Sequence, residues 1–415
     1  MRIIAQTSKA RSSPVGSGLL IQKQLPGTRF QQRNHLLTQL GPEGRRLLLL
    51  LVCRLLAMLL SLGLGGCGLA PGQPTAEDLL YLGWDDAGRE QLFLSKPDKE
   101  TQLLTSFDAG VQGYAPSPDG RHIALSTMGE NSSSELWIMA EDGSSQKQLH
   151  SCLQAECSSL AWAPDSRRLL FERREIGGDG MAGAPTLWWL DTQTAEVRTV
   201  HEDQSRHGTF GRLSPDGQWL SYHSPEQEGL AIYNLEDGRS HFITNEIGTA
   251  AAWSPDGRQL VVPLLDLVIS HGDEGDDHQA HEHDYQTAVH LLRLDVDSGE
   301  QQTISGDIQG EDSVPAWSPD GQYIAFGRRA LGTGASRQLW IMRADGSEAR
   351  ALADDPTINH GPPAWSADSR YLLFQQIPQD HLSSDPQIWR IEIETGVKEQ
   401  LASSGMQPAW LMPTG

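Results

Sequence analysis

The chain has 415 residues, 38% of them hydrophobic, and a formal net charge of −22 at pH 7. This acidic balance argues against nucleic acid as a partner, because binding to a phosphate backbone needs clustered Lys and Arg. With 42 Gly and 23 Pro, the composition is that of a globular protein with many turns. The length exceeds the usual single domain of about 100–200 residues unless the fold is built from repeats.

The first 66 residues form a basic leader that differs from the rest of the chain. They hold nine Lys or Arg and a single acidic residue, Glu43. The stretch RRLLLLLVCRLLAMLLSLGLGGC begins at Arg45, continues through an apolar run and ends in Gly65-Gly66-Cys67. A basic region, an apolar region and small residues before a cleavage site are typical of a secretory signal. We therefore predict that residues 1–66 are removed and that residues 67–77 form a short linker.

The end of this leader, Leu64-Gly65-Gly66-Cys67, also resembles the lipobox of bacterial lipoproteins. In that family the Cys receives lipid on its sulfur and becomes the mature N-terminus. The resemblance implies that Cys67 is lipidated and anchors an exported protein on the periplasmic or extracellular side of a membrane. Arg54 interrupts the apolar run, which departs from the pattern. A single transmembrane anchor is the alternative, although a charge at mid-membrane is costly.

A turn of the type Ser-Pro-Asp-Gly recurs in six similar segments after the leader. In such a turn Pro presets the first corner, Asp hydrogen-bonds its own backbone and Gly accepts a positive φ. Successive segments start 46, 51, 40, 64 and 48 residues apart, which matches a propeller blade of four strands. The six segments start at Ala115, Ala161, Arg212, Ala252, Ala316 and Ala364.

Each repeat is expected to form four strands, and the two ends of the chain together supply the four strands of one further blade. The residues after the turn alternate as in a strand, for example at 323–326. Residues 78–106 supply a second, third and fourth strand, and residues 408–411 supply the missing first strand. We therefore predict an all-β, seven-bladed β-propeller over residues 78–415, closed by pairing its C-terminal strand with the N-terminal blade. Six blades is the alternative if one unit is degenerate.

The repeats resemble the TolB-type β-propeller repeat of bacteria, whose hallmark is a WSPDG turn followed by an IAF-like strand. Six copies carry this signature within residues 78–415. Only about ten residues separate Cys67 from the first expected strand, so we expect no α/β domain of the TolB kind before the propeller. The partner contacts of that family are therefore not carried over.

The residues that recur in every repeat are interpreted as scaffold. An aspartate found once per blade in the same turn points to a structural role, and the tryptophans before the turns are expected to pack between blades. The aspartates are Asp119, Asp165, Asp216, Asp256, Asp320 and Asp368, and the tryptophans are Trp162, Trp253, Trp317, Trp365 and Trp410.

An insertion in one repeat, residues 264–286, is rich in imidazoles and carboxylates. These groups could hold a divalent metal such as Zn, Cu, Ni or Ca, and we expect the insertion to overhang the mouth of the central channel. A solvating polar loop is the alternative interpretation. The candidate ligands are His271, Asp273, Asp276, His278, His281 and His283, with Asp277 and Asp284 beside them.

Two cysteines, Cys152 and Cys157, remain once Cys53 and Cys67 are assigned to the leader and the anchor. In an exported chain we expect them to form a disulfide, with two free thiols as the alternative.

The sequence thus favours an exported, lipid-anchored and non-catalytic platform that binds a protein or a cell-envelope component on the loop-bearing face. Membrane attachment would run through Cys67. One alternative is a metal-dependent propeller enzyme of the lyase or hydrolase type with His ligands at the channel. His207, His223 and His360 lie near expected strand starts or loops, but they form no local metal-binding motif. The other is a metal-binding lipoprotein that uses residues 271–284.

Overall fold

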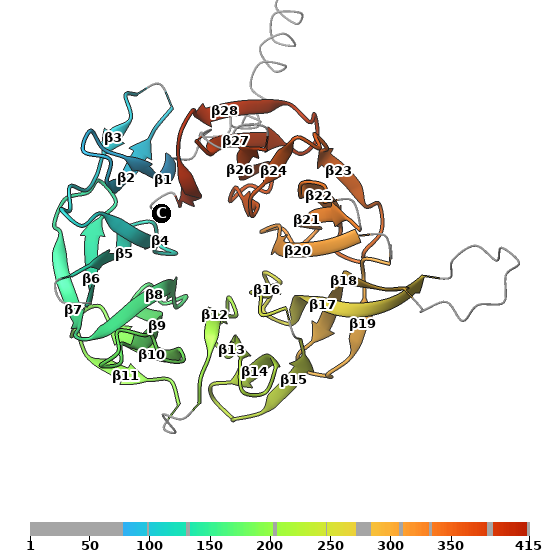
Figure 1. Cartoon of the computed structure of the whole chain (residues 1–415), viewed down its shortest axis with the longest axis horizontal. Coiled ribbons are helices and arrows are strands. Elements are labelled where there is room, and N and C mark those ends of the chain that lie inside the picture. The colour runs from blue at the N-terminus through green and yellow to red at the C-terminus, as the bar shows by residue number, and fades with distance from the viewer. Residues whose placement is uncertain are drawn as a thin grey trace, which may run out of the picture. The chain divides into compact units, whose positions relative to one another are not determined.

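The computed structural model describes residues 78–97, 99–129, 133–201, 206–245, 247–270, 284–306, 310–331, 334–379 and 385–412. These residues lie within one compact unit, Pro74–Gly415. They form an all-β propeller in which the strands stand around a common axis (Figure 1) and none of these ranges contains a helix. Accordingly, the described ranges hold no helix with the length and apolar character needed to cross a membrane.

The described strands fall into six hydrogen-bonded sheets, which we number around the ring. Sheet 1 combines the two ends of the unit as β29 (Met406–Leu411), β1 (Asp78–Trp84), β2 (Glu90–Ser95) and β3 (Gln102–Leu103). Sheet 2 contains β4 (Val111–Pro116), β5 (His122–Met128), β6 (Ser134–Ala140) and β7 (Lys147–Cys152). Sheet 3 contains β8 (Ala155–Trp162), β9 (Arg168–Glu175), β10 (Thr186–Asp191) and β11 (Val197–Thr199).

Sheet 4 contains β12 (Thr209–Leu213), β13 (Trp219–Ser224), β14 (Gly229–Asn234) and β15 (Ser240–Thr244). The first half of sheet 5 contains β16 (Ala252–Trp253), β17 (Gln259–Ser270), β18 (Asp284–Asp295) and β19 (Gln301–Thr303). Its second half contains β20 (Gly310–Trp317), β21 (Tyr323–Ala330), β22 (Gln338–Arg343) and β23 (Arg350–Ala353). Sheet 6 contains β24 (Ile358–His360), β25 (Ala364–Trp365), β26 (Tyr371–Pro378), β27 (Gln387–Glu392) and β28 (Lys398–Ala402).

Each sheet runs from the centre of the ring to its rim. Figure 1 shows first strands such as β4, β8, β12 and β20 nearest the centre, and fourth strands such as β7, β11, β15 and β23 at the rim. The C-terminal β29 pairs antiparallel with β1, and Leu79 lies opposite Trp410. The two halves of sheet 5 are joined by a parallel bridge between Val289 and Glu311.

The recurring turn adopts the geometry that its residues favour. In the copy at 254–257, Gly257 has φ +72°, a value that favours glycine. The Ser254 hydroxyl donates to Asp256 over 2.7 Å and accepts the backbone N–H of Gln259 over 2.9 Å. This hydrogen bond from Ser254 holds the pKa of Asp256 below its ordinary value. The aspartates of the other five turns likewise accept hydrogen bonds from their own turn, in agreement with the predicted structural role.

The core consists of apolar layers between neighbouring sheets. Phe171, Phe326 and Phe374 occupy equivalent positions of the second strands, and all three are fully buried. Tryptophan side chains also link one sheet to the sheet before it. The indole N–H of Trp162 donates to the carbonyl of Ala115 over 2.9 Å, and Trp365 makes the same type of bond. These contacts fix the angle between successive sheets.

Because neighbouring strands are antiparallel, the connections lie on two opposite faces of the propeller. Turns that join first to second or third to fourth strands lie on one face, which we call the turn face. Connections that join second to third strands, or a fourth strand to the next first strand, lie on the other, which we call the loop face. Described parts of the loop face include residues 85–89, 153–154, 176–185, 206–208 and 225–228.

Candidate functional site

The predicted metal ligands lie outside the described residues, so a metal site there stays a prediction from sequence. They are His271, Asp273, Asp276, His278, His281 and His283. The strands on either side, β17 and β18, are paired along their full length to Ser270 and Asp284. Figure 1 shows this hairpin pointing away from the centre of the ring. The described parts of the insertion, 264–270 and 284–286, therefore extend away from the central channel and not over its mouth as we expected.

Of the predicted cysteine sites, Cys67 also lies outside the described ranges. Cys152 and Cys157 are joined by a disulfide, and both are fully buried. This bond closes the connection between β7 and β8, that is, between sheets 2 and 3.

The three histidines considered as channel ligands each contact a different partner. His207 Nδ1 pairs with Glu226, and His223 Nε2 lies 3.3 Å from the carbonyl oxygen of Asn245. His360 Nδ1 lies 3.1 Å from a backbone carbonyl oxygen, and burial lowers its pKa, which keeps the ring neutral at pH 7. Within the part of the chain that the structure describes, no three His, Cys, Asp or Glu side chains are grouped to hold a metal.

Exposed apolar side chains gather on the loop face of sheets 1 to 4. Five such side chains lie at the loop-face end of a strand or in a loop-face connection, and their exposed fractions run from 37% to 71%. They are Trp84, Met128, Leu153, Met181 and Phe210. The other exposed large apolar residues lie elsewhere, Leu103 and Phe242 on fourth strands and Val397 on the turn face. We call the first five residues the apolar arc.

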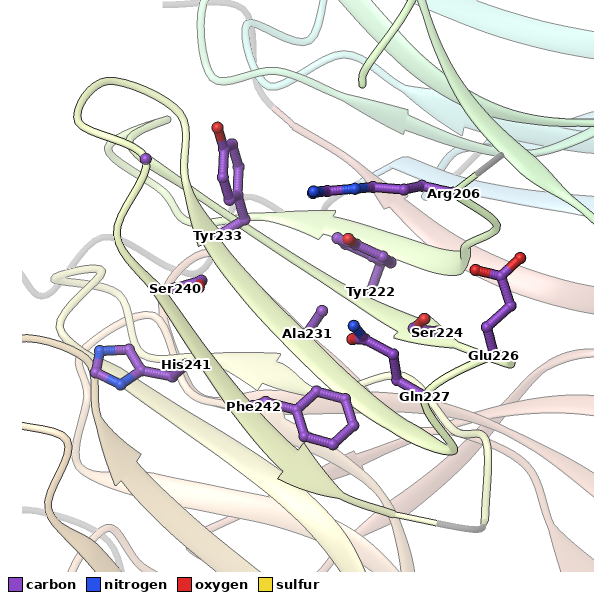
Figure 2. A pocket seen from close by; sticks show the side chains of 11 residues that line it. Arg206, Tyr222, Ser224, Glu226, Gln227, Ala231, Tyr233, Ser240, His241 and Phe242 are labelled. Atoms are coloured by element: carbon purple, nitrogen blue, oxygen red, sulfur yellow. The ribbon is translucent and has the colours of Figure 1, made fainter. Parts of the chain in front are cut away.

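A groove of about 560 Å³ runs along the surface of sheet 4 that faces sheet 3. Figure 2 shows Arg206 extending over Tyr222 toward Tyr233, with Phe242 on the outer strand. Burial raises the pKa of Tyr222, so its phenol is neutral and can donate or accept hydrogen bonds. The loop-face end of the groove is formed by Arg206, Glu226 and Gln227.

A second pocket, of about 460 Å³, lies on the loop face of the second half of sheet 5 and of sheet 6. Its walls come from the start of β20, the end of β21 and the residues before β22. Unlike the groove, it is dominated by charged and amide side chains. We call it the charged pocket, and its polar lining includes Glu311, Asp312, Arg329, Arg337, Asn359 and Gln379.

Sequence reasoning did not single out the groove or the charged pocket. Arg206 and Arg337 are ordinary basic residues in variable connections, and nothing in their local sequence marks them. The apolar arc could have been noticed as single large apolar residues, such as Leu153 and Met181, within polar connections.

No family model matches the chain. It is 26% identical over 192 residues to "Uncharacterized peptidase YuxL" of Bacillus subtilis, which is 40% of this chain and 28% of that protein. It is 26% identical over 197 residues to "Uncharacterized protein Atu1656" of Agrobacterium fabrum, which is 46% of this chain and 56% of that protein. The chain therefore spans less than two thirds of either relative.

Comparison with solved structures gives higher coverage of the chain. Puromycin hydrolase is similar with a TM-score of 0.58 at 16% identity, covering 80% of this chain and 53% of that one. The β-propeller domain of the Trilobed protease from Pyrococcus furiosus is similar with a TM-score of 0.53 at 16% identity, covering 78% of this chain and 91% of that one. TolB from Acinetobacter baumannii has a TM-score of 0.47 at 15% identity, covering 81% of this chain and 66% of that one. The likenesses to puromycin hydrolase and to the Trilobed protease domain show the fold alone: the chain is an all-β propeller. TolB is among its structural neighbours.

Proposed function

We propose that the protein is a binding platform outside the cytoplasm whose ligand is a protein or another component of the cell envelope. The observation that carries this proposal is the apolar arc. Five of the eight large apolar residues that are exposed in the described part of the chain share one face, across four successive sheets. Apolar surface gathered on one face is typical of protein interaction sites, whereas scattered single residues are not.

The groove between sheets 3 and 4 supports the same face as the site of binding. It carries tyrosines, a phenylalanine and an arginine, the residue types that are enriched where proteins bind one another. Its loop-face end adjoins the connections that carry the arc, so one ligand could use both.

We propose further that the platform is a closed ring of seven blades. The pairing of β29 with β1 supports closure. Each half of sheet 5 has four strands of its own, which supports its division into two blades. With sheet 5 counted as two units, seven buried apolar clusters also lie between successive units, and one of them joins sheet 6 to sheet 1. A closed ring would hold the loop-face connections on a rigid frame.

An anchored location outside the cytoplasm is part of this proposal. The lipobox-like end of the leader at Cys67 suggests a lipid anchor. The disulfide between Cys152 and Cys157 is consistent with an oxidising compartment, in which such bonds persist.

Photo-cross-linking tests the proposed function. A photoreactive amino acid placed at Leu153 or Met181 should give a specific cross-linked product in cells that produce the protein. The same group at Val397, which is 64% exposed but lies on the turn face, is the matched control. Equal products from both faces, or none from the loop face, would overturn the proposal.

A further inference from the structure

The charged pocket contains two carboxylates, and both are already neutralised by a partner. Asp312 is fully buried and accepts two hydrogen bonds from Arg328, from Nε over 2.6 Å and from an Nη over 2.9 Å. Glu311 accepts a hydrogen bond from Arg329 Nε over 2.7 Å. Such bidentate or charge-assisted pairs satisfy the charge of each carboxylate. The acids in the pocket are therefore not available to bind a cation.

Arg337 is the exception among the charged groups of the pocket. In the described ranges, no carboxylate lies within ion-pair distance of its guanidinium, and its buried Nε has no hydrogen-bond partner. Burial, followed by the nearby charge of Arg329, lowers the pKa of Arg337. A guanidinium remains protonated even then. Among the described residues, three guanidinium groups thus face two carboxylates, which leaves one positive charge that these carboxylates do not compensate.

The structure holds Arg337 in this place. Its side chain lies across Gly327 of β21, where a Cβ atom would come within 2.3 Å of Arg337 Cδ. Its backbone N–H donates to Asn359 Oδ1 over 3.0 Å, which leaves the Asn359 amide N–H groups to donate elsewhere. Leaving a partly buried cation unpaired costs stability, and an anionic ligand would offset that cost.

We propose that the charged pocket binds the carboxylate group of a small ligand, with the Arg337 guanidinium as its main contact and the Asn359 amide as a further donor. A planar guanidinium fork matches a carboxylate in shape. A single negative charge also matches this single positive charge, whereas a doubly charged phosphate would bring a second negative charge for which the described lining residues offer no further unpaired cation. This site lies over sheets 5 and 6, away from the apolar arc, and does not depend on the proposed platform.

A titration followed by saturation-transfer NMR tests the proposal on the full-length protein purified from its producing cells in detergent. The probes are acetate, tri-alanine, tri-alanine amide and inorganic phosphate. Acetate and tri-alanine should bind, and the amide, which lacks the carboxylate, should not. Tighter binding of tri-alanine than of acetate would identify a peptide end as the source of the carboxylate, and equal binding would identify the carboxylate alone.

The variant Arg337→Gln should weaken binding of both carboxylates at least about tenfold, since hydrogen bonds to charged groups are the strong ones. Arg337→Lys, which keeps the charge but not the fork, should also bind less tightly. Arg390→Gln, which removes an arginine paired with Glu399, is the matched control and should bind normally. Without ligand, Arg337→Gln should unfold at a temperature no lower than that of the native protein, which separates lost binding from lost folding.

Three results would overturn the proposal. Binding of the amide as tightly as the free acid would exclude the carboxylate as the recognised group. Unchanged binding by Arg337→Gln would exclude the site. Tighter binding of phosphate than of acetate, lost in Arg337→Gln, would exclude the carboxylate class.

Discussion

The buried ion pair between Asp312 and Arg328 gives the most quantitative prediction for the stability of the fold. Asp312 is fully buried, Arg328 is 8% exposed, and two hydrogen bonds join them. The guanidinium also lies 4.6 Å from the ring centroid of Trp340. Removing the acid alone, in Asp312→Ala, takes from a buried cation the carboxylate that accepts both of these hydrogen bonds. Such changes cost about 3–5 kcal/mol of unfolding free energy, and the indole face offsets only part of this loss.

Removing both charges should be far less harmful. In the double variant Asp312→Leu/Arg328→Met no buried charge remains, and apolar side chains of similar volume fill the space. Replacements of this kind are often neutral or stabilising. We therefore expect the double variant to lose less than about 1.5 kcal/mol, well below the loss in Asp312→Ala.

Urea unfolding followed by tryptophan fluorescence measures both variants against the native protein. The reasoning is refuted if Asp312→Ala costs less than about 1 kcal/mol, or if the double variant loses as much as the single variant. Either result would mean that the pair is not desolvated in solution as its burial implies.

Two further predictions concern the repeated scaffold. Trp162→Phe should lower the free energy of unfolding in urea by about 1 kcal/mol more than Trp317→Phe does. The reason is that the Trp162 indole N–H donates to the Ala115 carbonyl, whereas the buried Trp317 Nε1 has no partner in the described part of the chain. Equal losses in the two variants would contradict this prediction. The pKa of Asp256 is lowered in the fold, so the unfolded chain takes up the proton first as the pH falls. Its contribution is therefore present above about pH 4 and lost below it, and the unfolding temperature of Asp256→Asn should fall less steeply from pH 5 to pH 2 than that of the native protein.

The parts of the fold that were predictable are those governed by local chemistry. The Ser-Pro-Asp-Gly turn at 254–257 specifies a tight hairpin through its own hydrogen bonds. The pattern at 323–326 specifies a strand, and the structure buries both faces of it because sheets pack on either side. The strands at 78–106 and the C-terminal strand were found for the same reason, and β29 pairs with β1 as predicted.

The parts that were missed depend on residues far apart in the sequence. The β17–β18 hairpin is paired along its whole length and extends away from the centre of the ring, and composition alone reveals neither feature. The isolation of Arg337 depends on Glu311 and Asp312 being taken by other arginines and on its contact with Gly327. No local pattern records which acid pairs with which base.

The loop face as a binding surface is the central claim, and the affinity for the partner cross-linked through Met181 tests it most directly. Leu153 and Met181 are 71% and 70% exposed, so replacing both with Asp should leave folding intact. The double variant Leu153→Asp/Met181→Asp should bind that partner at least about tenfold more weakly, because two apolar contacts become desolvated charges. Val397→Asp, on the turn face, should bind as the native protein does. Unchanged affinity of the double variant, or an equal loss in Val397→Asp, would contradict the account.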